Sequence, residues 1–533
     1  MKRIRNYSIS GSKYFILGVI FLVTVIITFI SMKFEQIMPS ATTMADATLP
    51  TVAMDTEAGT QYNVLHGYTS ELDSTLFYGN ITPVNKDRKL AITINTYGED
   101  VESVGYKIRS LEDKSLIENT EVSGYQVTDN KINVTLNIKN LLDTGKEYAL
   151  EVVLKTKKHD AVYYYTRIMY GTDYDLQKKL DFVRDFNACT FDSARLKDIG
   201  GYLETSSVGD NTNYGKVNIN CSLSQIGWGD LEPYIESEIT PEIISINDDV
   251  AIIRLDYRVG AANDYSSSDT YNVNEYYRIR QTNSGFYLLN FEREMNQVFD
   301  AKNDLTSSAK INLGINSSTY VNCTSDEKGI YTYFVNQGSL WCFNSSSQTF
   351  TRVFSFRGEE TDSVREDYDA HNIKIMKIED NGDATFLVSG YMNRGEHEGQ
   401  VGVSLCRYSY SDNDVTERLF IPVAIPYNIL TQNVGGVSYV SNDKFYIHID
   451  ETLYSVDLVS KEVMTEITGL KEDAYAVSDA GDAIAYSVSG DIYNTDTIRI
   501  LNMSNDSAYE INADEGDTLR PLGYIDSDFI YGM

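Results

Sequence analysis

The chain is poor in basic residues. Its 533 residues include 45 lysines and arginines against 77 aspartates and glutamates, so the formal net charge is −32. Nucleic acids and anionic lipid headgroups bind clustered lysine and arginine, and a strongly acidic surface repels both. We therefore exclude nucleic acid as a partner and expect most of the acidic side chains to form a solvated exterior.

Cysteine and histidine are scarce too, with five residues of each type. The cysteines form no C-x-x-C pair and have no histidine nearby at metal-ligand spacing, which argues against a zinc site and a redox motif. The signatures G-x-S-x-G, H-E-x-x-H, G-x-x-x-x-G-K and G-x-G-x-x-G, typical of hydrolases, zinc peptidases and nucleotide-binding proteins, are absent. The sequence thus indicates no catalytic residue and no cofactor.

Long uncharged hydrophobic runs are missing, with one exception. Residues 14–32 hold nineteen residues without a charge, close to the roughly 20 that a helix needs to span a bilayer. Lys2, Arg3, Arg5 and Lys13 precede the run with no acid among them, and positive charge beside a spanning segment stays on the cytoplasmic side. This pattern predicts a transmembrane anchor.

The predicted localisation is therefore the cell membrane, with a single pass. Residues 1–13 are expected to be a cytoplasmic tail, residues 14–32 the anchor, and the bulk of the chain extracytoplasmic. A cleaved signal peptide is the alternative, but its apolar core is about 7 to 15 residues long. Residues 33–65, rich in Ala, Thr, Met and Ser without a sustained period, are expected to form a flexible stalk.

Proline and tryptophan are rare, at eight and two residues, whereas tyrosine numbers 40. Together with many Val, Ile and Thr, this composition favours a mainly β protein. Residues 66–171 contain alternating segments such as KLAITINTYG, KINVTLNIKNL and YALEVVLKTK, which predict a small β-sandwich. Apolar residues at helical spacing in residues 173–190 predict a helix within an α+β linker module that spans 172–240.

One short segment of the predicted sandwich carries a family resemblance. Leu142, Gly145 and Tyr148, in the sequence L-D-T-G-K-E-Y, resemble the tyrosine corner of fibronectin type III and immunoglobulin-like domains. The resemblance implies an immunoglobulin-like fold, in which the Tyr148 hydroxyl bonds back to the backbone. It gives these three residues a structural role and does not bear on function.

The remaining residues, 241–533, show the most regular pattern. Four segments spaced about 45 to 50 residues apart share a layout of four short strands, which is typical of propeller blades. The sequences S-D-A-G-D-A-I-A-Y at 478–486 and L-Y-S-V-D-L at 453–458 resemble TolB and WD-like propellers and the amino-terminal propellers of prolyl-oligopeptidase-type peptidases. Residues 251–299 are interpreted as a divergent blade.

The last predicted blade is incomplete, because residues 521–533 supply only one hairpin half. Propellers usually close by pairing their first and last strands. Either residues near 210–240 complete the ring, or the chain is shorter than the natural gene product.

The densest polar cluster joins two apolar strands and contains Arg394, Glu396, His397 and Glu398, with glycines at positions 395 and 399. Binding residues often lie on such loops, so these four are the candidate ligand-binding residues, with a solvated hairpin as the alternative. Acidic turns such as Asp380-Asn381-Gly382-Asp383 could bind calcium, but ordinary β-turns account for them. Tyrosine-rich strands at 163–165 and 276–277 could contact a sugar or peptide, or could pack in the core.

The sequence therefore predicts a membrane-anchored binding or scaffolding protein of the bacterial cell envelope. It would recognise a protein, peptide or glycan through a β-propeller. The alternative is the propeller-containing part of a prolyl-oligopeptidase-like hydrolase whose catalytic domain lies beyond residue 533.

Overall fold

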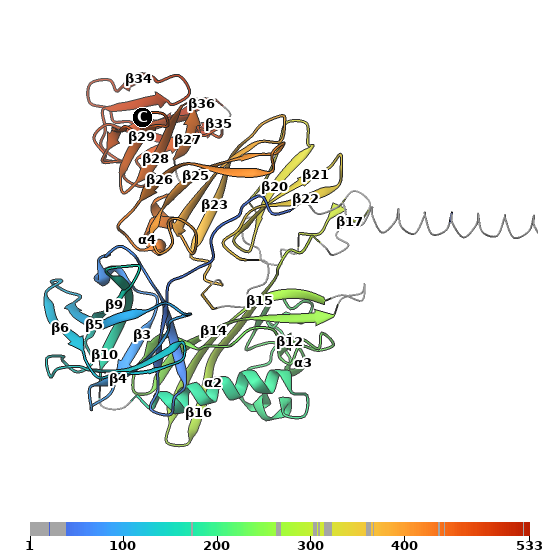
Figure 1. Ribbon diagram of the computed structural model, residues 1–533. Helices are drawn as coiled ribbons and strands as arrows, with labels where there is room; N and C mark the ends of the chain where they lie inside the picture. The colour runs from blue at the N-terminus through green and yellow to red at the C-terminus, as the bar shows by residue number, and fades with distance from the viewer. Residues whose placement is uncertain are drawn as a thin grey trace, which may run out of the picture.

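The computed structural model describes residues 21, 39–171, 174–262, 268–301, 306–307, 310–313, 322–358, 364–365, 367–434, 437–441, 443–525 and 527–533. The chain is mainly β, as predicted, and its strands are grouped in several antiparallel sheets. Figure 1 shows a lower part, in blue and green, and an upper part, in yellow to red, with a dark blue segment between them.

Apart from Phe21, the predicted membrane-spanning segment lies outside the described residues. Within the part of the chain that the structure does describe, no helix has the length and apolar character needed to cross a bilayer. On this finding the predicted localisation, a single-pass membrane protein with an N-terminal anchor, is wrong and is corrected. An uncharged run of sufficient length is required for a spanning helix but does not by itself establish one.

The first part of the molecule is a sandwich of two five-stranded sheets. Every strand pair in it is antiparallel except β3 with β10, which is parallel. The first sheet, in spatial order, consists of β2 (Gln61–His66), β1 (Thr51–Asp55), β4 (Lys89–Asn95), β8 (Lys131–Asn137) and β7 (Gln126–Thr128). The second consists of β3 (Ile81–Val84), β10 (Val162–Tyr170), β9 (Glu147–Thr156), β5 (Val101–Ser110) and β6 (Leu116–Val122), with the short helix η1 (Ser74–Leu76) nearby.

The sandwich begins earlier than the sequence suggests. Strands β1 and β2 lie within the residues expected to form a stalk, and four of the five residues of β1 are buried. Val52 and Met54 on one face of β1 and Thr51 and Ala53 on the other are all buried, so β1 lacks the alternation of a half-buried strand. By contrast, β8 alternates strictly between exposed and buried residues, as its sequence predicts.

The middle unit packs helix α2 (Leu176–Phe191) on a six-stranded sheet. Its apolar stripe of Leu180, Val183 and Phe186 is fully buried, and the Phe186 ring lies edge-on to Tyr277 at 5.6 Å. The sheet is formed by β11 (Lys216–Asn218), β16 (Gly285–Gln297), β15 (Ser268–Thr282), β14 (Val250–Ala262) and β12 (Tyr234–Ile235) in spatial order, with β13 (Glu242–Ile246) also paired to β14. Helices η2 (Leu196–Tyr202) and α3 (Leu223–Ile226) complete the unit.

This arrangement changes two expectations. The predicted helix at 173–190 is present as α2, but it does not belong to a linker separate from the strands that follow. The expected divergent blade at 251–299 instead forms β14 to β16, the sheet on which α2 lies. The physical reason is that an amphipathic helix must bury its apolar stripe, and the nearest long sheet supplies the surface.

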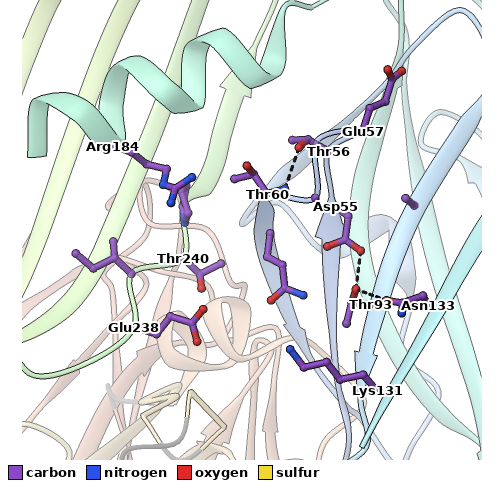
Figure 2. A pocket seen from close by; sticks show the side chains of 15 residues that line it. Asp55, Thr56, Glu57, Thr60, Thr93, Lys131, Asn133, Arg184, Glu238 and Thr240 are labelled. Atoms are coloured by element: carbon purple, nitrogen blue, oxygen red, sulfur yellow. Dashed lines mark hydrogen bonds between the residues drawn. The ribbon is translucent and has the colours of Figure 1, made fainter. Parts of the chain in front are cut away.

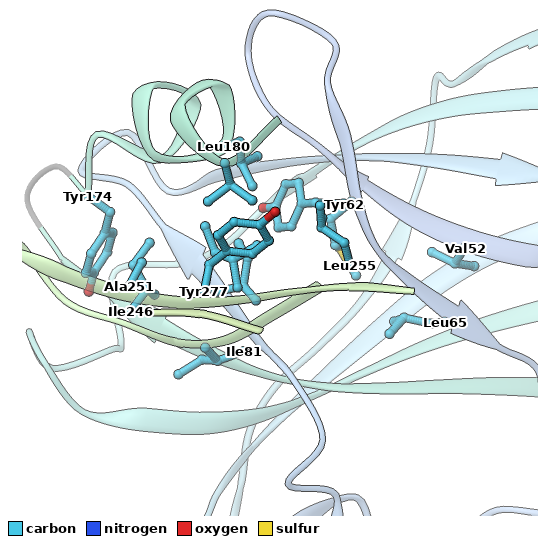
Figure 3. Close-up of a cluster of buried hydrophobic side chains, with 14 of the residues drawn as sticks. Val52, Tyr62, Leu65, Ile81, Tyr174, Leu180, Ile246, Ala251, Leu255 and Tyr277 are labelled. Atoms are coloured by element: carbon cyan, nitrogen blue, oxygen red, sulfur yellow. The ribbon is translucent and has the colours of Figure 1, made fainter. Parts of the chain in front are cut away.

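The sandwich and the middle unit share one hydrophobic core. A continuous cluster of buried side chains runs from Leu49 to Met295 and includes residues of both parts. Figure 3 shows Tyr62 of β2 beside Leu180 of α2, with Leu255 of β14 close by. The two parts are therefore packed as a single body rather than joined by a flexible linker.

Asn63 connects the two parts through hydrogen bonds. Its side chain is completely buried and its backbone has a positive φ of 47°. The amide nitrogen donates to the carbonyl of Ile81 at 2.9 Å, and the amide oxygen accepts from the backbone N–H of Ile243 at 2.7 Å. Its own backbone N–H donates to the carbonyl of Pro241 at 2.9 Å.

The upper part is a propeller-like array of four four-stranded antiparallel sheets, each with its strands in chain order. The first strands of successive sheets contact one another, as β19 with β23 and β23 with β27. The strands are β19 (Cys323–Ser325), β20 (Tyr331–Asn336), β21 (Ser339–Asn344) and β22 (Thr349–Phe354); β23 (His371–Ile378), β24 (Ala384–Tyr391), β25 (Val401–Ser409) and β26 (Asp414–Pro422); β27 (Ser438–Ser441), β28 (Lys444–Ile449), β29 (Thr452–Asp457) and β30 (Val463–Thr468); and β31 (Tyr475–Val477), β32 (Ala483–Ser487), β33 (Thr497–Asn502) and β34 (Ser507–Asn512).

The four sheets coincide with the four segments predicted as blades. Helix α4 (Tyr427–Asn433) lies between the second and third sheets, and a final hairpin of β35 (Arg520–Ile525) and β36 (Asp528–Gly532) follows the fourth. A further short hairpin, β17 (Thr306–Ser307) with β18 (Lys310–Ile311), precedes the array. Among the described strands, β35 and β36 pair only with each other, so these strands do not close a ring.

Candidate functional site

The loop between β24 and β25, residues 392–400, carries the four predicted ligand-binding residues. Two of them, Arg394 and Glu398, contact an extended segment at residues 39–50, which we call the strap. The strap leads into β1 and is the dark blue segment that passes between the two parts of the molecule in Figure 1. The loop therefore holds a segment of the same chain.

Arg394 is almost completely buried, with 7% of its side chain exposed. Its Nε donates to the carbonyl of Ala45 at 2.9 Å, and its Nη2 donates to the carbonyl of Met44 at 3.1 Å. The same Nη2 lies 2.5 Å from Oδ1 of Asp46. The guanidinium thus contacts three consecutive residues of the strap.

Glu398 contacts the next residues along the strap. Its Oε1 accepts hydrogen bonds from the backbone N–H groups of Thr48 at 2.6 Å and Leu49 at 2.9 Å. Its Oε2 accepts from the Thr48 hydroxyl at 2.8 Å. These are charge-assisted bonds, which are stronger than bonds between neutral groups.

The other two predicted residues do not join them. The His397 ring stacks on Phe420 at 3.7 Å, and its Nε2 lies 2.9 Å from Oε1 of Glu417 on β26. Glu396 is exposed. The structure thus brings Arg394 and Glu398 together on the strap and leaves His397 and Glu396 outside this group.

The residues of the predicted tyrosine corner lie at the start of β9. Leu142 and Tyr148 are buried, and Gly145 has a positive φ of 75°. The Tyr148 hydroxyl accepts a hydrogen bond from the backbone N–H of Asp143 at 3.0 Å. This bond ties the turn to the strand that follows it.

Three of the five rings in the tyrosine-rich strands pack inside the molecule, whereas Tyr163 and Tyr276 are partly exposed. Tyr164 and Tyr165 are buried, and their hydroxyls bond to the Pro50 carbonyl and the Leu72 backbone N–H, both at 2.8 Å. Tyr277 is buried as well and donates to Glu275 at 2.6 Å. These rings are not available to a sugar or peptide at the surface.

A cleft of about 650 Å³ lies where the first sheet of the sandwich meets the middle unit. One wall consists of the β1–β2 hairpin with β4 and β8, and the other of α2 and the segment before β13 (Figure 2). The cleft is lined by Asp55, Thr56, Glu57, Gly59, Thr60, Gln61, Ala91, Thr93, Lys131, Asn133, Arg184, Glu238, Ile239, Thr240 and Pro241.

Asp55 is the central carboxylate of the sandwich wall. Its Oδ2 accepts a hydrogen bond from the Thr93 hydroxyl at 2.7 Å. Burial raises the pKa of Asp55, an effect that the bonds from Thr93 and Gln61 and the charge of Lys131 partly oppose. The wall therefore presents a carboxylate that has lost part of its hydration and is only partly compensated.

The opposite wall carries Arg184 on α2 and Glu238 on the segment that leads to β13 (Figure 2). The end of the cleft is fixed by Gln177 of α2, which accepts from the Thr56 hydroxyl at 2.5 Å and donates to the Thr60 hydroxyl at 3.1 Å. The shared core beneath the cleft and these bonds hold the two walls at a set separation.

The described residues contain no group of three or more histidine, cysteine, aspartate or glutamate side chains placed to bind a metal ion. At the acidic turn 380–383, the Asp383 carboxylate accepts hydrogen bonds from Arg407 at 3.0 Å and from the backbone N–H of Tyr410 at 2.9 Å. The oxygens that calcium would need thus bond to protein groups at this turn.

Sequence reasoning missed the cleft completely. Its residues come from five separate segments between positions 55 and 241, and no motif links them. The cleft forms where α2 packs against the sandwich. The sequence of neither segment predicts that contact.

Comparison with known proteins adds little to this description. No protein-family model and no curated protein matches the chain. Among solved structures, oligogalacturonate lyase from Vibrio parahaemolyticus is 6% identical over 53% of this chain and 87% of its own, with a TM-score of 0.19. Tricorn protease is 9% identical over 84% of this chain and 45% of its own, with a TM-score of 0.18.

Both of these neighbours are β-propeller-like proteins. A eukaryotic initiation factor is 9% identical over 77% of this chain and 85% of its own, with a TM-score of 0.21. These scores are too low to carry an argument, so the propeller-like description rests on the sheets of this chain themselves, and no function follows from the neighbours.

Proposed function

We propose that this chain is a non-catalytic binding protein whose cleft receives a short peptide or an amino acid. The observation that supports this most strongly is that both facing walls of the cleft carry both signs of charge: Asp55 and Lys131 on one, Glu238 and Arg184 on the other. A ligand with an ammonium group and a carboxylate group can pair with both.

The size and chemistry of the cleft fit this ligand class. A volume of about 650 Å³ lies within the range of roughly 300 to 1,000 Å³ that is usual for small-molecule sites. Threonine hydroxyls and the amides of Gln61 and Asn133 supply further polar contacts. No aromatic ring is among the lining residues, so a sugar would find no ring on which to stack.

Asp55 supports the proposal through its energetic cost. A carboxylate whose pKa is raised by burial destabilises the folded state at neutral pH, because ionisation is easier in the unfolded chain. A ligand ammonium group would relieve that cost on binding. Groups that are kept at the expense of stability are often functional.

In this proposal the other parts have supporting roles. The sandwich is an immunoglobulin-like domain, an assignment favoured by the Tyr148 hydrogen bond and by the two facing sheets. The propeller-like array is a scaffold. The proposed site therefore lies on the sandwich and the middle unit, not on the propeller as the sequence suggested.

The test is calorimetric titration of the full chain with trialanine, and with trialanine that is acetylated at its amino end or amidated at its carboxyl end. We expect trialanine to bind and each blocked form to bind at least tenfold more weakly. Asp55→Asn and Arg184→Met should each weaken binding at least tenfold, while Asp55→Asn keeps or raises the melting temperature at pH 7.

Glu121→Gln provides the matched control, since Glu121 is exposed on β6, away from the cleft. Its affinity for trialanine should equal that of the unchanged chain. The proposal fails if trialanine does not bind at millimolar concentration, or if the two cleft variants bind it as well as Glu121→Gln does.

A further inference from the structure

The N-terminal end of the strap is held along the array by further contacts. The backbone N–H of Ala41 donates to the carbonyl of Arg352 at 2.9 Å, and the Asn413 side chain donates to the carbonyl of Pro39 at 3.0 Å. Ala41 is 5% exposed and belongs to the core between the first two sheets of the array. The strap therefore lies in a groove of the array.

At the centre of this groove, Arg394 and Glu398 bond mainly to backbone groups of the strap. Arg394 donates to two consecutive strap carbonyls, and Glu398 accepts from two consecutive strap N–H groups. An extended segment exposes its carbonyl and N–H groups in this way because it has no sheet partner of its own. Arg394 and Glu398 also bond to two strap side chains, those of Asp46 and Thr48.

The two charged residues fit a bound peptide better than an empty groove. Arg394 is 7% exposed with the strap in place. Loss of the strap would remove its bonds to the Met44 and Ala45 carbonyls, while its bond to the Phe356 carbonyl at 3.5 Å would remain. The bonds of Glu398 are likewise made with the strap. The groove therefore favours being filled, and it is filled here by a segment distant in sequence.

We infer that residues 392–400 and the adjoining groove form a binding site for an extended peptide with the pattern Asp-x-Thr-Leu, and that the strap is its intramolecular occupant. A peptide of this chemistry from outside the chain would bind by the same contacts once the strap has left. This inference is independent of the cleft, which lies on the other two parts of the molecule.

The experiment measures binding of a fluorescent peptide, SATTMADATL, which corresponds to residues 40–49, to the full chain. A tethered segment competes at an effective concentration in the millimolar range, so the unchanged chain should bind the peptide weakly. The double variant Asp46→Ala/Thr48→Pro, which weakens the strap, should bind it at least tenfold more tightly. Hydrogen exchange at the Ala41 and Leu49 amides reports whether the strap is released.

Two variants of the loop, added to the weakened-strap chain, decide the outcome. Glu398→Gln should reduce peptide affinity at least tenfold, whereas Glu396→Gln, on the same loop but exposed, should leave it unchanged. The inference is overturned if the strap amides remain protected in the double variant, if a released strap does not improve peptide binding, or if the two loop variants behave alike.

Discussion

Asn63 shows how one side chain can join two parts of a protein. Its buried amide bonds to backbone groups of both β3 and β13, and each partner would otherwise be a buried polar group without a hydrogen bond. Leaving such a group unsatisfied costs about 1 to 3 kcal/mol. The positive φ of 47° also suits asparagine better than most other residues.

We predict that Asn63→Ala lowers the free energy of unfolding by about 2 to 4 kcal/mol, the sum of lost bonds and backbone strain. Urea denaturation followed by circular dichroism measures it. Asn63→Gly separates the two causes, because glycine accepts a positive φ but forms no side-chain bond. Recovery of full stability by the glycine variant would contradict the hydrogen-bond explanation.

Helix α2 is the element that organises the lower part of the molecule. It buries Leu180, Val183 and Phe186 in the shared core. Its outer surface supplies Arg184 to the cleft, and Gln177 bonds to Thr56 and Thr60 at the end of the cleft. Packing and the proposed site thus depend on the same four turns of helix.

Phe186→Ala is expected to destabilise the chain by about 3 to 5 kcal/mol, because it leaves a cavity among Tyr277 and Phe291. The midpoint of guanidinium denaturation should fall accordingly. Phe186→Leu, which fills most of the volume, should cost much less. Equal losses for the two variants would show that the ring contacts, and not the cavity, account for the effect.

Elements with one buried face were predictable from sequence, whereas β1, which is buried on both faces, was not. The alternation of KINVTLN located β8, and the spacing of apolar residues located α2 within a few residues. Strand β1 has no alternation because it is buried on both faces, so its sequence does not indicate a strand. The blades were found because their layout repeats four times.

The two candidate sites also differ in how much of each is predictable from the sequence. Arg394 and Glu398 were found as a dense polar loop, but their partner, the strap, lies about 350 residues away in sequence. The cleft is lined by residues from five segments. None of these segments has a polar pattern that distinguishes it from an ordinary surface segment. Contacts between distant segments depend on how whole elements pack, and a single sequence does not report them.

The stability of the whole molecule should depend on pH through a buried histidine at the junction between the sandwich and the array. There the His66 ring of β2 stacks on Tyr368 at 3.9 Å, and burial lowers the pKa of His66 to about 3. Burial also lowers the pKa values of His371 and His448 within the array. Each of these imidazoles is neutral in the folded chain at a pH where it is protonated in the unfolded chain.

Stability should therefore be fully present above pH 6.5, the ordinary pKa of histidine, and should fall as the pH drops from 6.5 toward 3. The His66 contribution to the slope is at most about 1.4 kcal/mol per pH unit. His66→Phe keeps a stacked ring and should flatten the curve of melting temperature against pH. His159→Gln, in the turn after β9, serves as control, and an identical curve for both variants would contradict the assignment.

The core that the sandwich shares with the middle unit bears on the ancestry of the chain. Because Tyr62 and Leu180 belong to one core, a gene fragment that encoded either part alone would produce a polypeptide with an apolar face open to water. Recombination between them would separate side chains that pack in one core. We therefore expect the two parts to be inherited together. A substitution in one part of the shared core should restrict the substitutions that the other part can accept.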